Sequence, residues 1–309
     1  DYVMPFIPAT DYKGMAATGS SYVGVHAAAM GRGIPANLVD DVTRMLPEPV
    51  RVSVDVTKGA GQFRAVGRAV VVSKLSEVDQ AGQAAIDRMQ DSSSLGKLQS
   101  LGEFLGARNE GGVSASPVVI VVSSIAGGSG AGQYLDVIEA VKSTVRNEPW
   151  AKQFFSLLYA PDVFDNVKGS GGIAGNALAT VAETVGGFWT QTPSQATLEL
   201  YKSKGLSPSF GSAGDRVGAA YPFIIGRQNS KVAFDNQGDV YSAVATSISA
   251  WMTDDKVQDD ITAYGTGNWD SALGANKLAD ESKLRVPLDS TPPFSSLGFG
   301  RVALGRERF

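Results

Sequence analysis

Apolar and polar positions follow two periods along the chain, which predicts strands separated by helices. Residues 50–56 alternate valine with polar residues, the pattern of a half-buried strand. Residues 62–90 instead carry apolar side chains at helical spacing. The same patterns predict further strands at residues 2–7, 154–159 and 222–225, and further helices at residues 94–105, 174–188 and 239–252.

The best-defined unit is a strand, a glycine-rich loop and a helix. Residues 117–122 form a mainly β-branched run, typical of a central parallel strand buried on both faces. A loop over residues 123–132 follows, and apolar residues then recur at helical spacing from residue 134 to residue 145. Strands that alternate with helices predict an α/β fold, a doubly wound and mostly parallel sheet with helices on both faces. A ligand is expected at the carboxyl ends of its strands.

Composition excludes several classes of function. The net charge of −4 over 309 residues argues against a surface that tracks a nucleic-acid backbone. The chain has no cysteine and one histidine, His26, so disulfides, thiolate nucleophiles and multi-histidine metal sites are excluded, and no residue is singled out as a metal ligand. No apolar run suits a membrane span or signal peptide. We therefore expect a cytoplasmic protein with no nucleic-acid partner and no membrane insertion.

The loop that ends at Gly132 has the composition of a phosphate site. Glycines let backbone N–H groups approach an anion, and the start of the following helix adds partial positive charge. A P-loop is excluded, because it requires Lys after this glycine and the chain has Gln133. The dinucleotide pattern also fits poorly, because only Ala131 separates Gly130 from Gly132. A flexible linker is the remaining alternative.

These residues resemble the signature of the tubulin superfamily, G-G-G-T-G-S-G at the end of a central strand. The matching positions are Ala126, Gly127, Gly128, Ser129, Gly130, Ala131 and Gly132. The chain departs from the signature at Ala126, Ser129 and Ala131. Ser129 retains a hydroxyl for phosphate, whereas Ala131 leaves only the backbone.

Shorter matches follow the order of the same family. One resembles the G-A-G-x-x-P-x-x-G-R loop of the bacterial division protein FtsZ and comprises Gly59, Ala60, Gly61, Gln62, Gly67 and Arg68. By resemblance this loop would help to cover the terminal phosphate, although an ordinary turn is the alternative for its glycines. Asp11 ends a segment similar to the family's Thr-Asp strand, and Pro161 follows the expected strand at residues 154–159. Both are therefore implied at the nucleotide.

Three asparagines are candidates for recognising guanine. Asn236 follows Asp235 and opens an expected helix, like the Asp-Asn that starts the family's long central helix. In the family this amide reads guanine, because it both donates and accepts hydrogen bonds. Asn229 and Asn176 are rival candidates, and helix capping is the alternative role for all three.

A further match implies a catalytic loop. Residues 265–270 resemble the family's G-x-x-N-x-D, which implies that Asn268 and Asp270 orient the attacking water in the nucleotide site of the next subunit. Leu273 stands where the family carries its second polar or acidic residue. A surface turn is the alternative for this segment.

The resemblance covers much of the chain up to about residue 270 and implies a tubulin-like protein that binds GTP or GDP with Mg²⁺. It further implies head-to-tail assembly with itself into filaments, with hydrolysis completed between neighbouring subunits. The nearest group is the large bacterial tubulin-like proteins, in which a segment such as residues 294–298 follows the nucleotide domain.

We expect a GTP-binding domain over residues 1–252, whose first strand and first glycine loop would precede Asp1. Residues 253–309 would hold the catalytic-type loop and the start of a second region. Two alternatives remain. One is a non-hydrolysing, nucleotide-binding scaffold subunit of a larger bacterial complex, which Leu273 favours. The other is a dinucleotide-dependent oxidoreductase.

Overall fold

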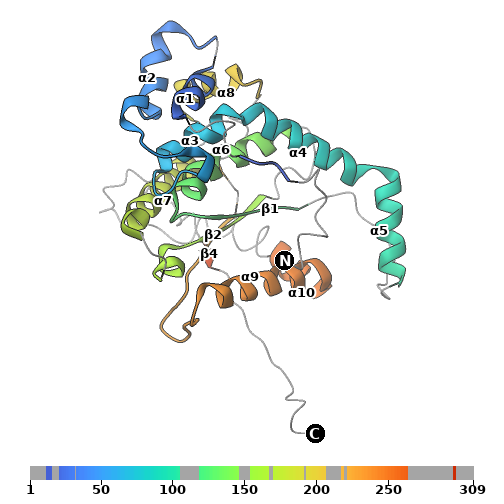
Figure 1. The fold of residues 1–309 in the computed structure, drawn as a ribbon. Coiled ribbons are helices and arrows are strands. Elements are labelled where there is room, and N and C mark those ends of the chain that lie inside the picture. Colours follow the sequence, from blue (N-terminus) through green and yellow to red (C-terminus); the bar gives the residue numbers. More distant parts are fainter. Residues whose placement is uncertain are drawn as a thin grey trace.

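The protein is a helix-rich α/β fold built on one parallel sheet (Figure 1). The computed structural model describes residues 12–15, 21–31, 33–104, 118–145, 154–166, 170–190, 193–206, 217–218, 221–263 and 295–296. The strands are β1 (Val119–Ser124), β2 (Phe154–Tyr159), β3 (Tyr221–Ile225) and β4 (Ser295–Ser296). They lie in the order β1-β2-β3-β4, and each neighbouring pair is parallel. The predicted α/β class is confirmed.

Most of the described residues lie in helices. They are α1 (Tyr22–Met30), α2 (Val39–Met45), α3 (Arg64–Ser73), α4 (Leu75–Gln90), α5 (Ser92–Phe104), α6 (Gly128–Val145), α7 (Ile173–Thr190), α8 (Gln195–Ser203), α9 (Gln237–Thr253) and α10 (Asp255–Ala263). The predicted helix at residues 62–90 is therefore two helices, α3 and α4, with a break at Lys74. None of the described helices is long and apolar enough to cross a membrane.

Helices cover both faces of the sheet, as predicted. Successive side chains of a strand point to opposite faces, and β2 follows this rule. Phe154 and Leu158 belong to a core cluster shared with α6, whereas Phe155 and Leu157 belong to a cluster shared with α9. Figure 1 shows α3, α4, α6 and α7 on one side of the strands and α9 and α10 on the other. This two-sided cover leaves the carboxyl ends of the strands as the edge that carries the loops.

The position of β1 corrects one prediction. Its β-branched run indicated a central strand buried on both faces, but β1 is the edge strand of the described sheet, and Val122 is 47% exposed. The inner strands of the described sheet are β2 and β3, and β2 is buried except at Tyr159. A β-branched run favours extended backbone, but the pairing partners decide where the strand lies in the sheet.

The predicted strand at residues 50–56 is also wrong. The chain there forms two short 3-10 helices, Pro49–Arg51 and Val56–Lys58, joined by extended residues that belong to no described sheet. Val56 is buried, whereas Val50 is 90% exposed. Alternation correctly indicated extended backbone with one inward face, but a strand also needs a neighbouring strand for its backbone hydrogen bonds.

A second helical layer lies outside the sheet. α3 packs between α1 and α6, and α2 packs against α8. Their shared core includes Ala29, Val42, Val71 and Leu200, all fully or almost fully buried. Because α3 is held on both sides, the loop that enters it is fixed against the start of α6.

Candidate functional site

Two glycine loops meet beside the carboxyl end of β1. The first glycine loop, residues 59–63, enters α3, and the second glycine loop, residues 125–132, joins β1 to α6. The N–H of Gly128 donates to the carbonyl oxygen of Gly61 at 2.8 Å, and the N–H of Ala60 donates to Ser129 Oγ at 3.2 Å. The hydroxyl of Ser129, expected to contact phosphate, therefore holds the first loop.

The second loop is partly helical, which the sequence did not indicate. The pattern predicted that the helix restarts after Gly132, but α6 already begins at Gly128. Residues 128–132 therefore form its opening turn. The glycines that suggest a flexible loop lie mostly in regular helix.

Three glycines allow α3 and α6 to pack backbone against backbone. A Cβ atom at Gly67 would lie 2.2 Å from the carbonyl oxygen of Gly128, and one at Gly132 would lie 2.1 Å from that of Arg64. A Cβ atom at Gly128 would lie 2.5 Å from the nitrogen of Phe63. These distances are far below nonbonded contact, so only hydrogen fits at the three positions.

The remaining glycines have different roles. A Cβ atom at Gly130 would lie 2.4 Å from the carbonyl oxygen of Ser124, so this glycine lets α6 approach the end of β1. Gly59 and Gly61 have φ angles of 100° and 54°, which side chains disfavour. Gly127 has no atom within 4 Å of a Cβ position and therefore lies beside open space.

The start of α6 offers free hydrogen-bond donors. The N–H groups of Gly127, Ser129 and Gly130 have no partner in the part of the chain that the structure describes. No acidic residue lies in the first turn of this 18-residue helix. Unpaired N–H groups and the positive end of the helix dipole together suit an anion. The residues present therefore fit a phosphate group.

Asn176 lies between the two loops. It is the fourth residue of α7, and its side chain is buried, with the residue 7% exposed. Its Nδ2 donates to the carbonyl oxygen of Gln62 at 2.9 Å and to that of Ala126 at 2.9 Å. One amide thus joins the first loop to the second.

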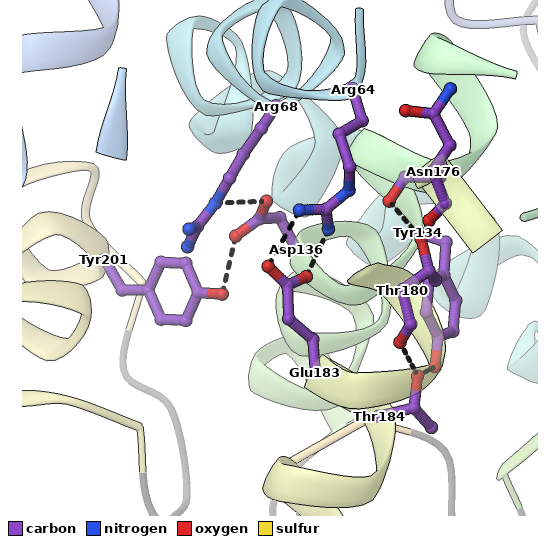
Figure 2. A network of polar contacts seen from close by, with 10 residues as sticks. Arg64, Arg68, Tyr134, Asp136, Asn176, Thr180, Glu183, Thr184 and Tyr201 are labelled. Atoms are coloured by element: carbon purple, nitrogen blue, oxygen red, sulfur yellow. Dashed lines mark hydrogen bonds and ion pairs between the residues drawn. The ribbon is translucent and has the colours of Figure 1, made fainter. Parts of the chain in front are cut away.

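A polar network fixes α3 to its neighbours behind the loops (Figure 2). Arg64 forms a two-pronged ion pair with Glu183 of α7. Arg68 donates through Nε to Asp136 of α6 at 3.3 Å, and the hydroxyl of Tyr201 in α8 donates to the same carboxylate at 2.7 Å. These contacts tie four helices together around the entry to α3.

Two members of this network, Arg68 and Tyr201, have shifted pKa values. The carboxylate of Asp136 raises the pKa of the Arg68 guanidinium above its ordinary value. Burial raises the pKa of Tyr201 well above its ordinary value, and the charge of Asp136 adds to this shift. The hydroxyl therefore stays protonated and keeps donating at neutral pH. The sequence did not single out Asp136, Glu183 or Tyr201, because no local pattern links residues of separate helices.

The carboxyl ends of β2 and β3 lie along the same edge of the sheet as the carboxyl end of β1. Pro161 begins a 3-10 turn, Pro161–Phe164, directly after β2. Asp162 in this turn accepts a hydrogen bond from the N–H of Arg227 at 2.8 Å, and Arg227 Nε donates to the carbonyl oxygen of Asp162 at 3.0 Å. Pro161 and the second glycine loop thus follow adjacent strands.

The other candidate residues have the following places. Asn236 caps α9: its Oδ1 accepts from the N–H of Asp239 at 3.1 Å. Asn229 forms a turn, because its Oδ1 accepts from the N–H groups of Lys231 and Val232, each at 2.8 Å. Both asparagines are exposed, and their recognition of guanine stays a prediction. The remaining candidates, Asp11, Asn268 and Asp270, lie outside the described residues.

The parallel sheet, the helices on both its faces and the interlocked glycine loops define an α/β protein whose loop edge offers free backbone donors. The chain belongs to the tubulin-like family, because the model of the family described as "Tubulin like" matches residues 36–309. The resemblance of the motifs is thereby confirmed at the level of the superfamily. No curated protein and no solved structure matches the chain.

Proposed function

We propose that this protein binds GTP where the two glycine loops meet, assembles head-to-tail with further copies of itself, and hydrolyses GTP at the junction between subunits. The single observation that carries GTP binding is the set of free N–H groups at Gly127, Ser129 and Gly130, at the positive end of α6. Family membership supports the proposal, because tubulin-like proteins generally bind GTP with Mg²⁺ and self-assemble. It also favours GTP over a dinucleotide.

The backbone is the proposed phosphate-binding surface. The N–H of Gly127 has no partner among the described residues, and the Cβ position of this glycine faces open space, so we place a phosphate oxygen here. The first glycine loop is hydrogen-bonded to the second through Gly61 and Ala60, so both would border the same phosphate chain. Ala131 in place of the family's serine is compatible with this arrangement, since no side-chain hydroxyl is needed there.

Magnesium would be held mainly through the nucleotide. The described residues contain no cluster of acidic or histidine side chains that could hold a metal ion. Mg²⁺ commonly keeps several waters and binds substrate phosphates with one or two carboxylates. When bound, it would neutralise charge that develops on the terminal phosphates.

The base and the attacking water are assigned to other residues. Both hydrogens of the Asn176 amide are used between the loops, so we propose Asn236 or Asn229 as the guanine-reading residue. Asn268 and Asp270 are proposed to orient the attacking water in the neighbouring subunit's site. On the motif resemblance we further propose a cytoplasmic bacterial filament.

The alternative is a scaffold subunit that holds nucleotide without turnover, and Leu273 favours it.

The test follows phosphate release and light scattering of the intact protein with GTP or GDP over a range of protein concentrations. Turnover per subunit that rises together with scattering supports hydrolysis between subunits. Binding of GTP without either signal supports the scaffold, and absence of GTP binding overturns both.

A further inference from the structure

We infer that Asn176 is a positioning residue, which holds the two glycine loops in one arrangement and thereby sets the discrimination between GTP and GDP. The inference rests on the proposed binding of GTP. The amide of Asn176 is the only described side-chain group that hydrogen-bonds to the backbone of both loops.

The two bonds use the full donor capacity of the amide. An asparagine Nδ2 carries two hydrogens, and one goes to Gln62 and the other to Ala126, at 2.9 Å each. The residue is 7% exposed, so water cannot easily replace either bond. Loss of the amide would leave the buried carbonyl group of Ala126 and the partly buried carbonyl group of Gln62 without this partner.

The bond to Ala126 also orients a phosphate-binding group. The carbonyl of Ala126 and the N–H of Gly127 belong to one planar trans peptide unit, so they point in opposite directions. When Asn176 holds this carbonyl on one side, the N–H of Gly127 is directed to the other. That N–H has no partner among the described residues, and the Cβ position of Gly127 faces open space.

The bond to Gln62 acts on the first loop in the same way. The carbonyl of Gln62 shares its peptide unit with the N–H of Phe63, which donates to the carbonyl oxygen of Ala60 at 2.9 Å. Asn176 therefore fixes the turn that contains Gly61. By the proposed function this loop covers the terminal phosphate, which GTP has and GDP lacks.

Helix α7 is held in place without Asn176. The buried hydroxyl of Thr184 shares a hydrogen bond with that of Tyr134 in α6 at 2.7 Å, and Glu183 pairs with Arg64 (Figure 2). A substitution at Asn176 can therefore release the loops while the helix remains docked. Thr184 supplies a matched control, because it is also a buried residue of α7 and bonds to neither glycine loop.

The test compares Asn176→Asp, Asn176→Ser and the control Thr184→Val in the intact protein. Aspartate keeps the shape of asparagine but places acceptors against two carbonyl oxygens, whereas serine keeps one donor. Dissociation constants for GTP and GDP are measured below the unfolding temperature of every variant. We expect Asn176→Asp to weaken GTP about tenfold more than GDP, as expected for one or two lost hydrogen bonds, and Asn176→Ser to have a smaller effect.

Thr184→Val is expected to lower thermal stability while the ratio of the two dissociation constants stays unchanged. A ratio that also stays unchanged in both Asn176 variants would overturn the inference while leaving GTP binding intact. A wild-type protein that fails to bind GTP would instead overturn the proposed function together with the inferred discrimination.

Amide hydrogen exchange in the absence of nucleotide tests the positioning role without relying on binding. The variant used is Asn176→Ser, because Asn176→Asp is more disruptive. Asn176→Ser should accelerate exchange in residues 59–63 and 125–132 together, and Thr184→Val should not. Unchanged exchange in both loops of Asn176→Ser would contradict the positioning role.

Discussion

The two glycine loops use glycine for different physical reasons. In the first, Gly59 and Gly61 have positive φ angles, and Cβ atoms there would meet little or nothing. In the second, Gly128 and Gly132 lie in regular helix, and Cβ atoms there would overlap the backbone of the first loop and of α3. Glycine thus permits a left-handed backbone conformation in the first loop and a close approach of two backbones in the second. The same substitution, glycine to alanine, should therefore lower the free energy of unfolding by different amounts in the two loops.

The largest effect is expected for Gly132→Ala. The added Cβ would lie 2.1 Å from the carbonyl oxygen of Arg64, so α3 and α6 must separate. Overpacking of this kind should cost about 3 kcal/mol of the free energy of unfolding, measured by urea denaturation. Gly82→Ala in α4 is the control, because a Cβ there would make only ordinary contacts with α6. It should stabilise the protein by about 0.5–1 kcal/mol.

The next largest effect is expected for Gly67→Ala, which should lower the free energy of unfolding by about 2–3 kcal/mol. Its Cβ would lie 2.2 Å from the carbonyl oxygen of Gly128. Combining it with Gly128→Ala sharpens the comparison. Both substitutions separate α3 from α6, so the double variant should lose less than the sum of the single losses. Full additivity in denaturation experiments would contradict a shared close approach.

A smaller effect is expected for Gly61→Ala. Space is available for its Cβ, but the φ angle of 54° is unfavourable for a side chain, which should cost about 1–2 kcal/mol. Gly61→Asn should cost less, because asparagine tolerates left-handed backbone. If alanine and asparagine destabilise the protein equally in thermal unfolding, conformation is not the reason for this glycine.

Gly127→Ala should change stability least, within about 0.5 kcal/mol, because its Cβ enters open space and its φ angle is not positive. The same methyl group would lie next to the proposed phosphate position and should weaken GTP binding. Denaturation and GTP titration of one variant therefore separate the two properties. Unchanged GTP affinity would place the phosphate away from Gly127.

Local patterns predicted much of the fold because helices and strands impose their period on the residues they bury. The predictions at residues 174–188 and 239–252 correspond to α7 and α9, and those at residues 154–159 and 222–225 to β2 and β3. Local patterns did not predict α1 or α8, although each helix starts at a capping serine, Ser21 or Ser194. That cap was the available signal.

The site could be predicted in part. The order of the motifs identified the tubulin-like family, which the family match confirms, because short loops with fixed glycine spacing are local features. The two hydrogen bonds from Asn176 to the loops could not be predicted, since they join segments far apart in the sequence. Its position also fitted helix capping and base recognition, and nothing local separates these roles.

The sequence by itself determined the α/β class, the strand-loop-helix unit around Gly127 and the family, because periodicity and glycine spacing act over a few residues. The tertiary structure alone decided that β1 lies at the edge of the described sheet and that Gly67 and Gly132 serve close packing. It also decided that Asn176 joins the two loops. These properties depend on which distant backbone atoms meet, and that is settled only when the helices pack against each other and the sheet.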